Sequence, residues 1–469
     1  MQEEQGRFGR LGGWLLKNDR WLLPAFLVFF FLIAFSIAVV QPHMDTPPAY
    51  GNPPDEGTRF LVPKYIMEHG RIPEGSEPEI RIPGYGFSYA LYNAGPYLLM
   101  GWILRFASLF TDSAFLLLLI ARTVNVLSGT LMAFFVKKLG DLWFPDRRFS
   151  WLFTLFVMLL PESLFMHTYV NTDSICMTSA AVILYGLSHM YFHKVGWKDA
   201  LLVGIGSGVL MLSYYNAYFY LVVAVLLFVP LFVKKEQGKR RVEWKRMLLY
   251  GGMILGIALL VSGWWFVRSA ILHQGDFLGL ATRKRMEAEY GAENVAALSW
   301  IGRGNPVRDF IKNLRIYEVL GQSFTAVFGS MTIYGPGFLY VVYDVLFLLG
   351  IASFVILWPA CRREGFQTHY FRINLFLCIL APFALWAYYS LFVDFQNQGR
   401  YLLPALIPLM YFIVSGYQRI RQTFKKCPES VFDGITAGFA FLWIGLLLYY
   451  VYGVAYPVYM DTVQALWTM

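Results

Sequence analysis

The stretch "WLLPAFLVFFFLIAFSIAVV" (residues 21–40) is entirely free of charged side chains. A helix of about 20 apolar residues crosses the hydrocarbon core of a bilayer, which is roughly 30 Å thick. The run from Leu22 to Val40 is longer than the apolar region of a secretory signal, and Gln-Pro-His-Met follows it instead of a small-residue cleavage site. We therefore expect a retained first membrane span.

The rest of the chain repeats this pattern. Of its 469 residues, 57% are hydrophobic, 18% are aromatic and only 15% are charged, which is too apolar for a soluble globular protein of this size. Helices are expected to do the spanning, because they satisfy their backbone polar groups internally. Apolar runs cover residues 22–40, 87–110, 114–136, 149–168, 174–192, 199–215, 217–233, 247–269, 336–359, 373–393, 402–418 and 431–454. The sequence thus predicts an all-α polytopic membrane protein.

Basic clusters decide the topology. They lie at Lys137-Lys138 with Arg147-Arg148 and in residues 234–246, 361–372 and 419–426. The positive-inside rule makes them cytoplasmic, whereas twelve spans and a cytoplasmic N-terminus would place all of them outside. The conflict disappears if residues 87–110, which include Pro96 and Arg105, form a helix lying at the outer face. We expect a bundle of about eleven transmembrane helices with external juxtamembrane helices.

The same topology places two long segments, residues 41–113 and 270–335, on the outer side of a single membrane domain (1–469). Loops of such length are usually functional. Residues 303–324 have the spacing of one amphipathic helix lying on the interface. The net charge of +9 is mostly explained by the cytoplasmic clusters, so no nucleic-acid partner is expected.

Several chemistries lack their motifs. The sequence has no HExxH, no paired CxxC, no GxxxxGK[ST] and no nucleophile elbow. Its four cysteines fall in apolar runs or in loops expected inside, which implies no disulfide framework. His43 and His69 could join nearby acids around a divalent cation, but their spacing fits no ligand signature. No cofactor is therefore assigned, and a divalent cation stays an open alternative.

The first outer segment carries an acidic pair in "YGNPPDEGTRF" (residues 50–60). Two prolines before Asp55 and Glu56 stiffen the chain, and Gly57 after them would let it turn sharply. Such a frame can hold a carboxylate still for catalysis. The alternative is a pair of solvated loop acids. Asp45 and Asp173 are expected on the same outer face.

Polar groups also lie at three other places that are expected outside: the turn at 171–173, Arg268 and Arg400. In "TYVNTDSICM" (168–177), Asn171 or Asp173 could cap the following helix or anchor a ligand in an external cavity. Arg268 and Arg400 either snorkel to headgroups or contact a lipid-linked phosphate, since guanidinium favours forked contacts to phosphate. Gly399 would let backbone amides approach the same anion.

These motifs together resemble a known family. The Pro-Asp-Glu motif at 54–56, the Asn-x-Asp turn at 171–173 and Gly-Arg-Tyr-Leu-Leu-Pro at 399–404 make the chain similar to the GT-C superfamily of integral-membrane glycosyltransferases. Within it, the chain resembles bacterial proteins with "PDE" and "QGRY.LP" motifs, mostly described only as predicted membrane proteins. The resemblance implies polyprenyl-phosphate sugar donors, a glycan or lipid acceptor, and transfer at the outer face of the cell membrane.

Carried over by motif, the resemblance places the catalytic acid at Asp55 or Glu56 and a phosphate contact at Arg400. The full set of expected substrate-binding residues is Asp45, Arg59, Asn171, Asp173, Arg268, Gln398, Arg400 and Tyr401. Relatives often read Asp-Glu-Pro-x-His, whereas Gly57 and Arg59 stand at the last positions here. That difference weakens the inference of an assisting histidine or a bound metal.

The expected reaction is an inverting transfer. A carboxylate would accept the proton of an acceptor hydroxyl, and outer arginines would stabilise the departing lipid phosphate. The main alternative is a transporter or flippase of lipid-linked saccharides, which needs ionisable residues through the bundle; Arg122 and Glu162 are the main ones. A non-catalytic scaffold for cell-envelope assembly is a third possibility. The sugar and the acceptor stay open.

Overall fold

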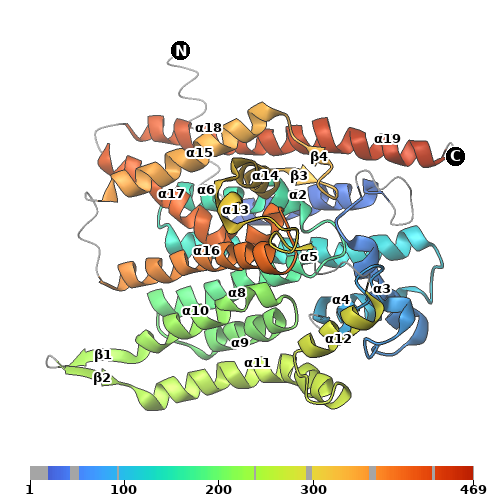
Figure 1. The fold of residues 1–469 in the computed structure, drawn as a ribbon. Helices are drawn as coiled ribbons and strands as arrows, with labels where there is room; N and C mark the ends of the chain where they lie inside the picture. Colours follow the sequence, from blue (N-terminus) through green and yellow to red (C-terminus); the bar gives the residue numbers. More distant parts are fainter. Residues whose placement is uncertain are drawn as a thin grey trace.

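The fold is a bundle of long helices that run side by side (Figure 1). The computed structural model describes residues 19–42, 52–91, 94–236, 239–291, 298–358, 366–424 and 428–467. Its only strands within these ranges form two short antiparallel hairpins, β1–β2 and β3–β4. The expectation of an all-α polytopic fold is confirmed.

The first half of the chain builds the first outer segment and one side of the bundle. Its elements are α2 (Asp19–Val40), α3 (Glu56–His69), η1 (Pro78–Ile80), η2 (Tyr89–Leu91), α4 (Gly95–Ala107), α5 (Ala114–Trp143), α6 (Arg147–Met158), α7 (Pro161–Phe165), α8 (Asp173–Phe192), α9 (Trp197–Met211), η3 (Tyr215–Ala217), α10 (Phe219–Phe228), η4 (Val229–Phe232), β1 (Val233–Glu236) and β2 (Lys239–Val242).

The second half adds the second outer segment and the remaining long helices. Its elements are α11 (Trp244–Leu272), α12 (Leu280–Tyr290), α13 (Val307–Lys312), α14 (Leu314–Thr325), β3 (Val327–Phe328), β4 (Ile333–Tyr334), α15 (Gly337–Ile356), α16 (Phe366–Phe392), η7 (Gly399–Ala405), α17 (Leu406–Thr423), α18 (Glu429–Leu448), the π-helical turn η8 (Tyr449–Ala455) and α19 (Tyr456–Trp467).

Nine helical segments in the described part of the chain are long and apolar enough to cross a membrane. They are Trp21–Val40, Ala114–Trp143, Asp173–Phe192, Tyr215–Phe232, Trp244–Leu272, Gly337–Ile356, Thr368–Phe392, Gly399–Thr423 and Glu429–Asp461. Each coincides with an apolar run of the sequence. The runs 87–110, 149–168 and 199–215 are not among them.

Two of these three runs still form helices inside the bundle. Run 149–168 is divided at Pro161, which has no backbone N–H to continue the helix, so α6 ends and the short α7 begins there. Helix α9 has only 15 residues. Because α6 packs against α5, α17 and α18, and α9 against α8 and α11, both complete the bundle between the longer helices.

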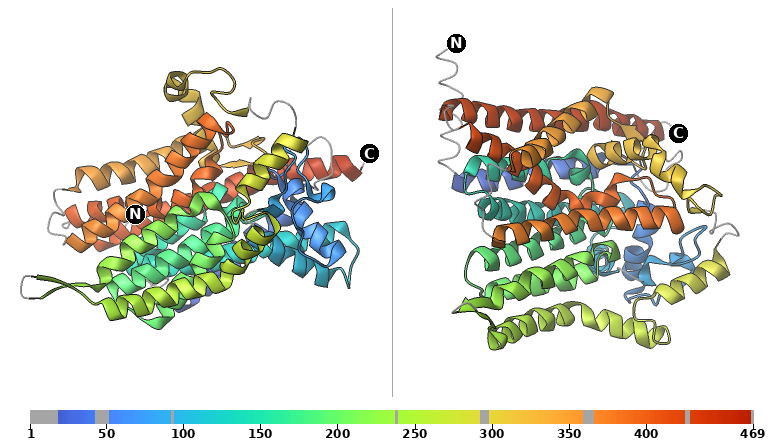
Figure 2. Two further views of the ribbon diagram at one scale, coloured as in Figure 1. Left: turned by 60° about the horizontal axis from the view of Figure 1, so that its bottom comes forward. Right: turned by 60° about the vertical axis from the view of Figure 1, so that its left-hand side comes forward.

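The third run, 87–110, contains only η2 and the 13-residue α4. Helix α4 packs against α3. Figures 1 and 2 place α3, α4 and α12 at one end of the bundle and the protruding β1–β2 hairpin at the opposite end. As the charge pattern predicts, α4 is not among the nine span candidates of the described residues.

The second outer segment differs from the expectation in one respect. Residues 303–324 form two helices instead of one, α13 and α14, because the side chain of Asn313 accepts a hydrogen bond from the Arg315 amide (3.1 Å) and caps a new helix. Helix α14 is amphipathic, with Leu320 buried and Glu318 exposed. It packs against η7 and so borders the segment that carries Arg400.

Buried charged side chains gather where the first outer segment meets the bundle. Most of the core is aliphatic and aromatic, but Glu56, Arg59, Arg122, Asp173 and Arg400 are all buried. A buried charge is costly unless it is paired, so these residues must be arranged around one another.

Candidate active site

Asp55 occupies a strained position at the start of α3. Its backbone is left-handed, with φ of 58° and ψ of 9°, and its side chain is 45% exposed. Non-glycine residues rarely adopt this conformation, although aspartate tolerates it better than most, and such strain is concentrated at functional sites. The sharp turn expected at Gly57 lies at Asp55 instead, because Gly57 is already inside the helix.

Two guanidinium groups converge on the Asp55 carboxylate. Arg400 Nη2 donates a hydrogen bond to Asp55 Oδ2 over 2.8 Å, and Arg59 Nη2 lies 3.7 Å from the same oxygen. Arg59 Nη1 also donates to Asp173 Oδ2 over 3.3 Å. Arg59 therefore bridges the acid of the first outer segment and the acid of the turn before α8.

Both arginines have N–H groups without a hydrogen-bond acceptor among the described residues. These are Arg400 Nη1 and Arg59 Nε, and both are buried. A buried charged donor without an acceptor is costly, so these N–H groups favour an anion at the site. Burial acts to raise the pKa of Asp55, but Arg400 and Arg59 outweigh it and hold that pKa below its ordinary value of 3.8.

Glu56, the other acid of the motif, lies in a different environment. Its side chain is only 2% exposed, and Arg122 contacts both of its oxygens, with Nε to Oε1 at 2.9 Å and Nη2 to Oε2 at 2.6 Å. The amide of Val170 donates to Oε1 over 2.8 Å. Arg122 also donates to three carbonyl oxygens at the C-terminal end of α2 and just beyond it, those of Ala38, Gln41 and Pro42. The Glu56–Arg122 pair thus joins α2, α3 and α5.

The turn before α8 is shaped by Asn171. Its Oδ1 accepts from the Ser174 amide (2.9 Å), and its Nδ2 donates to the carbonyl oxygens of Met166 (2.8 Å) and Tyr169 (2.9 Å). Asn171 therefore performs the capping role that the sequence allowed. Asp173, the first residue of α8, is left to contact Arg59.

Gly399 serves packing against α14. Its amide donates to Ser323 Oγ over 2.7 Å, and a Cβ atom at this position would lie 2.0 Å from the backbone nitrogen of Phe324. The Gly399 amide itself is therefore bonded to Ser323 and is not open to an anion, and the close approach to α14 accounts for a glycine at this position. Next to it, the Arg400 guanidinium lies 5.3 Å from the centre of the Tyr401 ring, and Gln398 donates to Gln396 over 3.2 Å.

Not every expected residue joins this cluster. Arg268 Nη2 donates to the carbonyl oxygens of Ile72 (3.3 Å) and Pro73 (2.9 Å), which ties α11 to the first outer segment. His69 pairs with Glu79 over 3.1 Å. Asp45 and His43 lie outside the described residues.

A divalent cation does not fit the two acids that the structure brings together. Asp55 and Asp173 share the guanidinium of Arg59, and Arg400 also contacts Asp55, so a metal ion there would face two positive charges. No three His, Cys, Asp or Glu side chains in the described ranges form a metal-binding group. Arg59 already supplies a positive charge between the two acids.

Two tyrosines beside Arg59 had no role in the sequence prediction. Arg59 Nη1 lies 3.5 Å from the Tyr97 hydroxyl, and its guanidinium carbon lies 5.6 Å from the centre of the Tyr89 ring. The chain has 30 tyrosines, so residue type alone could not single out these two. The sequence predicts Arg122 only as a charge within the membrane. It gives no sign of the pairing with Glu56, because the two residues are 66 positions apart.

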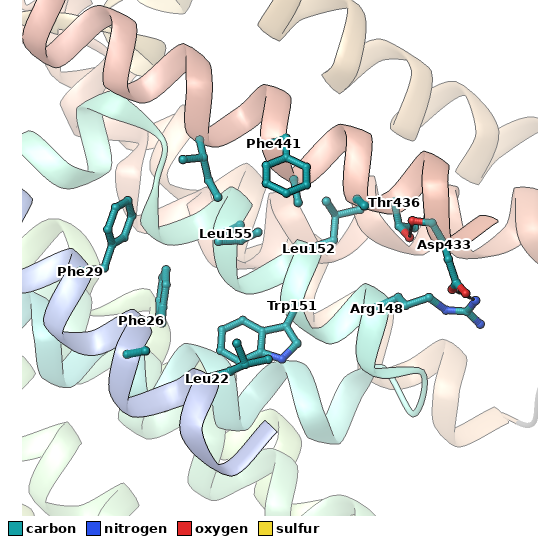
Figure 3. Close-up of a pocket in the computed structure, with 14 residues that line it drawn as sticks. Leu22, Phe26, Phe29, Arg148, Trp151, Leu152, Leu155, Asp433, Thr436 and Phe441 are labelled. Atoms are coloured by element: carbon teal, nitrogen blue, oxygen red, sulfur yellow. Dashed lines mark hydrogen bonds and ion pairs between the residues drawn. The ribbon is translucent and has the colours of Figure 1, made fainter. Parts of the chain in front are cut away.

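An apolar cavity of about 440 Å³ lies elsewhere, between α2, α6 and α18 (Figure 3). Phe26, Trp151 and Phe441 line it, and Arg148 at its edge pairs with Asp433 over 2.8 Å. None of the expected site residues lines this cavity. Residues of the 54–56 and 399–404 motifs meet at Asp55 instead.

Comparisons with known proteins agree with this fold. A family model described as "Predicted membrane protein (DUF2142)" matches residues 79–410. No curated protein sequence matches the chain.

Two solved structures share the architecture. The oligosaccharyltransferase of Archaeoglobus fulgidus, solved with a tethered acceptor peptide, has a TM-score of 0.54 and 14% identity and matches 95% of this chain. ArnT of Cupriavidus metallidurans bound to undecaprenyl phosphate has a TM-score of 0.52 and 14% identity and matches 94% of this chain. The match spans 56% of the oligosaccharyltransferase chain and 77% of ArnT. At this identity the likeness shows the fold, which is that of GT-C membrane proteins.

Proposed function

Because the chain belongs to the DUF2142 family of predicted membrane proteins and has a GT-C fold, we propose that it is a membrane-bound glycosyltransferase. It moves a sugar from a polyprenyl-phosphate donor to a glycan, lipid or polymer acceptor of the cell envelope. The observation that carries this proposal is the exposed Asp55 carboxylate beside two buried guanidinium groups that have N–H donors to spare.

The arginines suit a lipid-linked phosphate. Arg400 Nη1 and Arg59 Nε would donate to phosphate oxygens, because guanidinium binds phosphate through paired N–H groups. Structures of the same fold contain such lipids: ArnT of Cupriavidus metallidurans holds undecaprenyl phosphate, and AglB of Archaeoglobus fulgidus holds a dolichol-phosphate. The apolar tail of the donor would lie among the helices and membrane lipids.

Asp55 would act as the general base. It takes the proton of the acceptor hydroxyl while that oxygen attacks the anomeric carbon, and the bond between this carbon and the phosphate oxygen breaks. The electron pair leaves on the phosphate, whose charge changes from one to two negative, and Arg400 and Arg59 stabilise the added charge. A single direct displacement inverts the anomeric centre.

The ion pairs offer a way to couple donor binding to base strength. In the free protein Arg400 and Arg59 keep the Asp55 carboxylate charged, which makes it a weak base. A donor phosphate competes for Arg400 and brings its own negative charge, and both effects raise the proton affinity of Asp55. The base would therefore strengthen when the donor is in place.

The charge pattern supports an outer location for this site. The β1–β2 hairpin lies in the basic segment 234–246 and protrudes at the end of the bundle opposite α3 and α4 (Figure 1). By the positive-inside rule the hairpin end faces the cytoplasm. Asp55 would then act on the external face of the cell membrane.

The test is a transfer assay with the full chain in lipid nanodiscs. Radiolabelled polyprenyl-phosphate sugars and candidate acceptors are supplied to the wild type, to Asp55→Asn and to Glu68→Gln. Glu68 is a matched control, because it lies on α3 and its side chain is also 45% exposed. We expect transfer by the wild type and Glu68→Gln and loss of transfer in Asp55→Asn. Movement of the intact donor across vesicle membranes without product formation would instead identify a flippase.

A further inference from the structure

The segment between α16 and η7 places polar side chains at every second position. In "DFQNQGR" (394–400) these are Asp394, Gln396, Gln398 and Arg400. Such alternation puts Asp394, Gln396 and Gln398 on one side of an extended chain, and the backbone at Gln398 is extended, with φ of −128° and ψ of 126°. Arg400 follows in the first turn of η7. We call these four residues the polar ladder.

Hydrogen bonds link the first three members of the ladder. Gln398 Nε2 donates to Gln396 Oε1 over 3.2 Å, and Gln396 Nε2 donates to Asp394 Oδ2 over 2.6 Å. The last member, Arg400, donates to Asp55. The ladder is therefore a row of polar side chains whose last member contacts the proposed general base.

The opposite side of the segment is anchored in an aromatic cluster. The Phe395 ring lies 5.2 Å from that of Trp300 and 6.4 Å from that of Phe310. The indole of Trp386 donates to the Gln396 carbonyl oxygen over 2.7 Å. These contacts hold the ladder in one orientation, as recognition of a rigid ligand requires.

A row of aromatic side chains reaches Arg59, which lies beside Asp55. Tyr85, Phe87 and Tyr89 also alternate, and each ring centre lies 6.0 Å from the next. Burial, together with the charges of Asp394 and Asp55, raises the pKa of Tyr85 to about 12. The geometric link between the row and the cluster is Tyr89, whose ring centre lies 5.6 Å from the guanidinium carbon of Arg59.

We propose that the polar ladder and the aromatic row bind the sugar ring of the donor and set its identity, an inference that rests on the proposed function. Glutamine amides both donate and accept, and a carboxylate accepts, so together they match the hydroxyl groups of a neutral sugar. Tyr85 and Tyr89 would cover an apolar face of the ring. Recognition by buried polar groups discriminates strongly, because a sugar lacking the matching hydroxyl leaves them unpaired.

The local charges favour a neutral sugar over an anionic one. Asp394 brings a negative charge to the ladder. The nearest basic groups of the second outer segment are engaged: Arg283 pairs with Glu287 over 2.7 Å and also stacks on Phe87, and Arg303 stacks on Phe395. A uronate would place its carboxylate near Asp394.

The test compares binding of undecaprenyl phosphate with binding of the same lipid carrying glucose, galactose, mannose or glucuronate. The variants are Asp394→Asn and Gln396→Met, with Gln322→Met as control, because the Gln322 amide contacts Glu318 on the exposed part of α14. We expect the wild type and the control to bind one neutral glycolipid at least about tenfold more tightly than the bare lipid. Each ladder variant should reduce that preference about tenfold and keep its affinity for the bare lipid.

Three results would overturn the inference. The ladder has no role if both ladder variants keep the wild-type preference, or if they weaken binding of the bare and glycosylated lipids equally. A neutral sugar is excluded as the ligand if the wild type prefers the glucuronate lipid. If the wild type binds bare undecaprenyl phosphate no better than Arg400→Ala does, the phosphate site itself fails, and the inference fails with the proposed function.

Discussion

Arg400 and Asp55 are separated by 345 positions in the sequence, and Arg400 Nη2 donates to Asp55 Oδ2 over 2.8 Å. This contact joins the "QGRY.LP" motif to the "PDE" motif. It also restrains the one acid of the motif that is exposed. The following predictions depend on this pair and on the buried pair next to it.

Substituting Asp55 should abolish catalysis and spare the fold. Loss of a general base typically costs 10²–10⁴-fold in rate, so we expect Asp55→Asn to lower kcat by at least about 100-fold. The Tm of the variant should fall much less than that of Glu56→Gln, because Asp55 is half exposed and the amide oxygen of asparagine can still accept a hydrogen bond from Arg400. Initial transfer rates in nanodiscs measure the change in kcat, and thermal unfolding in nanodiscs measures the change in Tm. Undiminished transfer would remove Asp55 from the mechanism.

Substituting Glu56 should lower the stability of the protein more than the transfer rate of each folded molecule. Removal of one partner from a buried ion pair costs roughly 3–5 kcal/mol, and Glu56→Gln leaves Arg122 without its carboxylate. We expect a lower Tm and poor yield. A double-mutant cycle with Arg122→Met should show coupling between the two residues, and additive effects would disprove the pairing. Residual transfer per folded molecule should exceed that of Asp55→Asn.

Arg400→Lys should impair use of the donor. Lysine keeps the positive charge and loses the second N–H branch, so it cannot serve Asp55 and a phosphate oxygen in the same geometry. Removal of one donor to a developing charge costs about 10²–10³-fold in kcat at other oxyanion sites, and we expect a loss of this order. The conservative Arg315→Lys, on the exposed part of α14, serves as control and should keep the wild-type rate.

The pH dependence should report the ion pairs of Asp55. Its pKa in the folded protein is below 3.8, so the carboxylate stays charged above that pH and is protonated only as the pH falls through the lowered value. We expect kcat/KM of the wild type to show no acid limb between pH 4.5 and 7. In Arg400→Gln the pKa should rise and an acid limb should move toward this range. A wild-type limb above pH 5 would contradict the assignment.

Transfer should not require a divalent cation. Arg59 bridges Asp55 and Asp173 and already neutralises them. We therefore expect EDTA to leave the initial rate within twofold of the untreated enzyme. Loss of activity on chelation, restored by Mg²⁺ or Mn²⁺, would show that a metal displaces Arg59 in the donor complex.

Local sequence patterns predicted most of the fold. Apolar runs of sufficient length located the nine span candidates, and the basic clusters singled out residues 87–110 as a segment that does not cross. The exceptions are local breaks whose positions depend on single residues. Pro161 divides a run, and Asn313 caps a new helix where one continuous amphipathic pattern had been expected.

The composition and the spacing of the chain by themselves determined the membrane class, the positions of the long segments 41–113 and 270–335 and the motifs at residues 54–56, 171–173 and 399–404, because hydropathy and charge act over short stretches. Tertiary structure alone separated Asp55 from Glu56. Neighbours in a helix turn point in different directions, and only the fold brings Arg122 to one acid and Arg400 to the other. Only the tertiary structure shows that Arg268 donates to backbone carbonyl oxygens and that the Gly399 amide donates to Ser323. Which partner satisfies a buried charge depends on residues far away in the chain, and no local pattern encodes that.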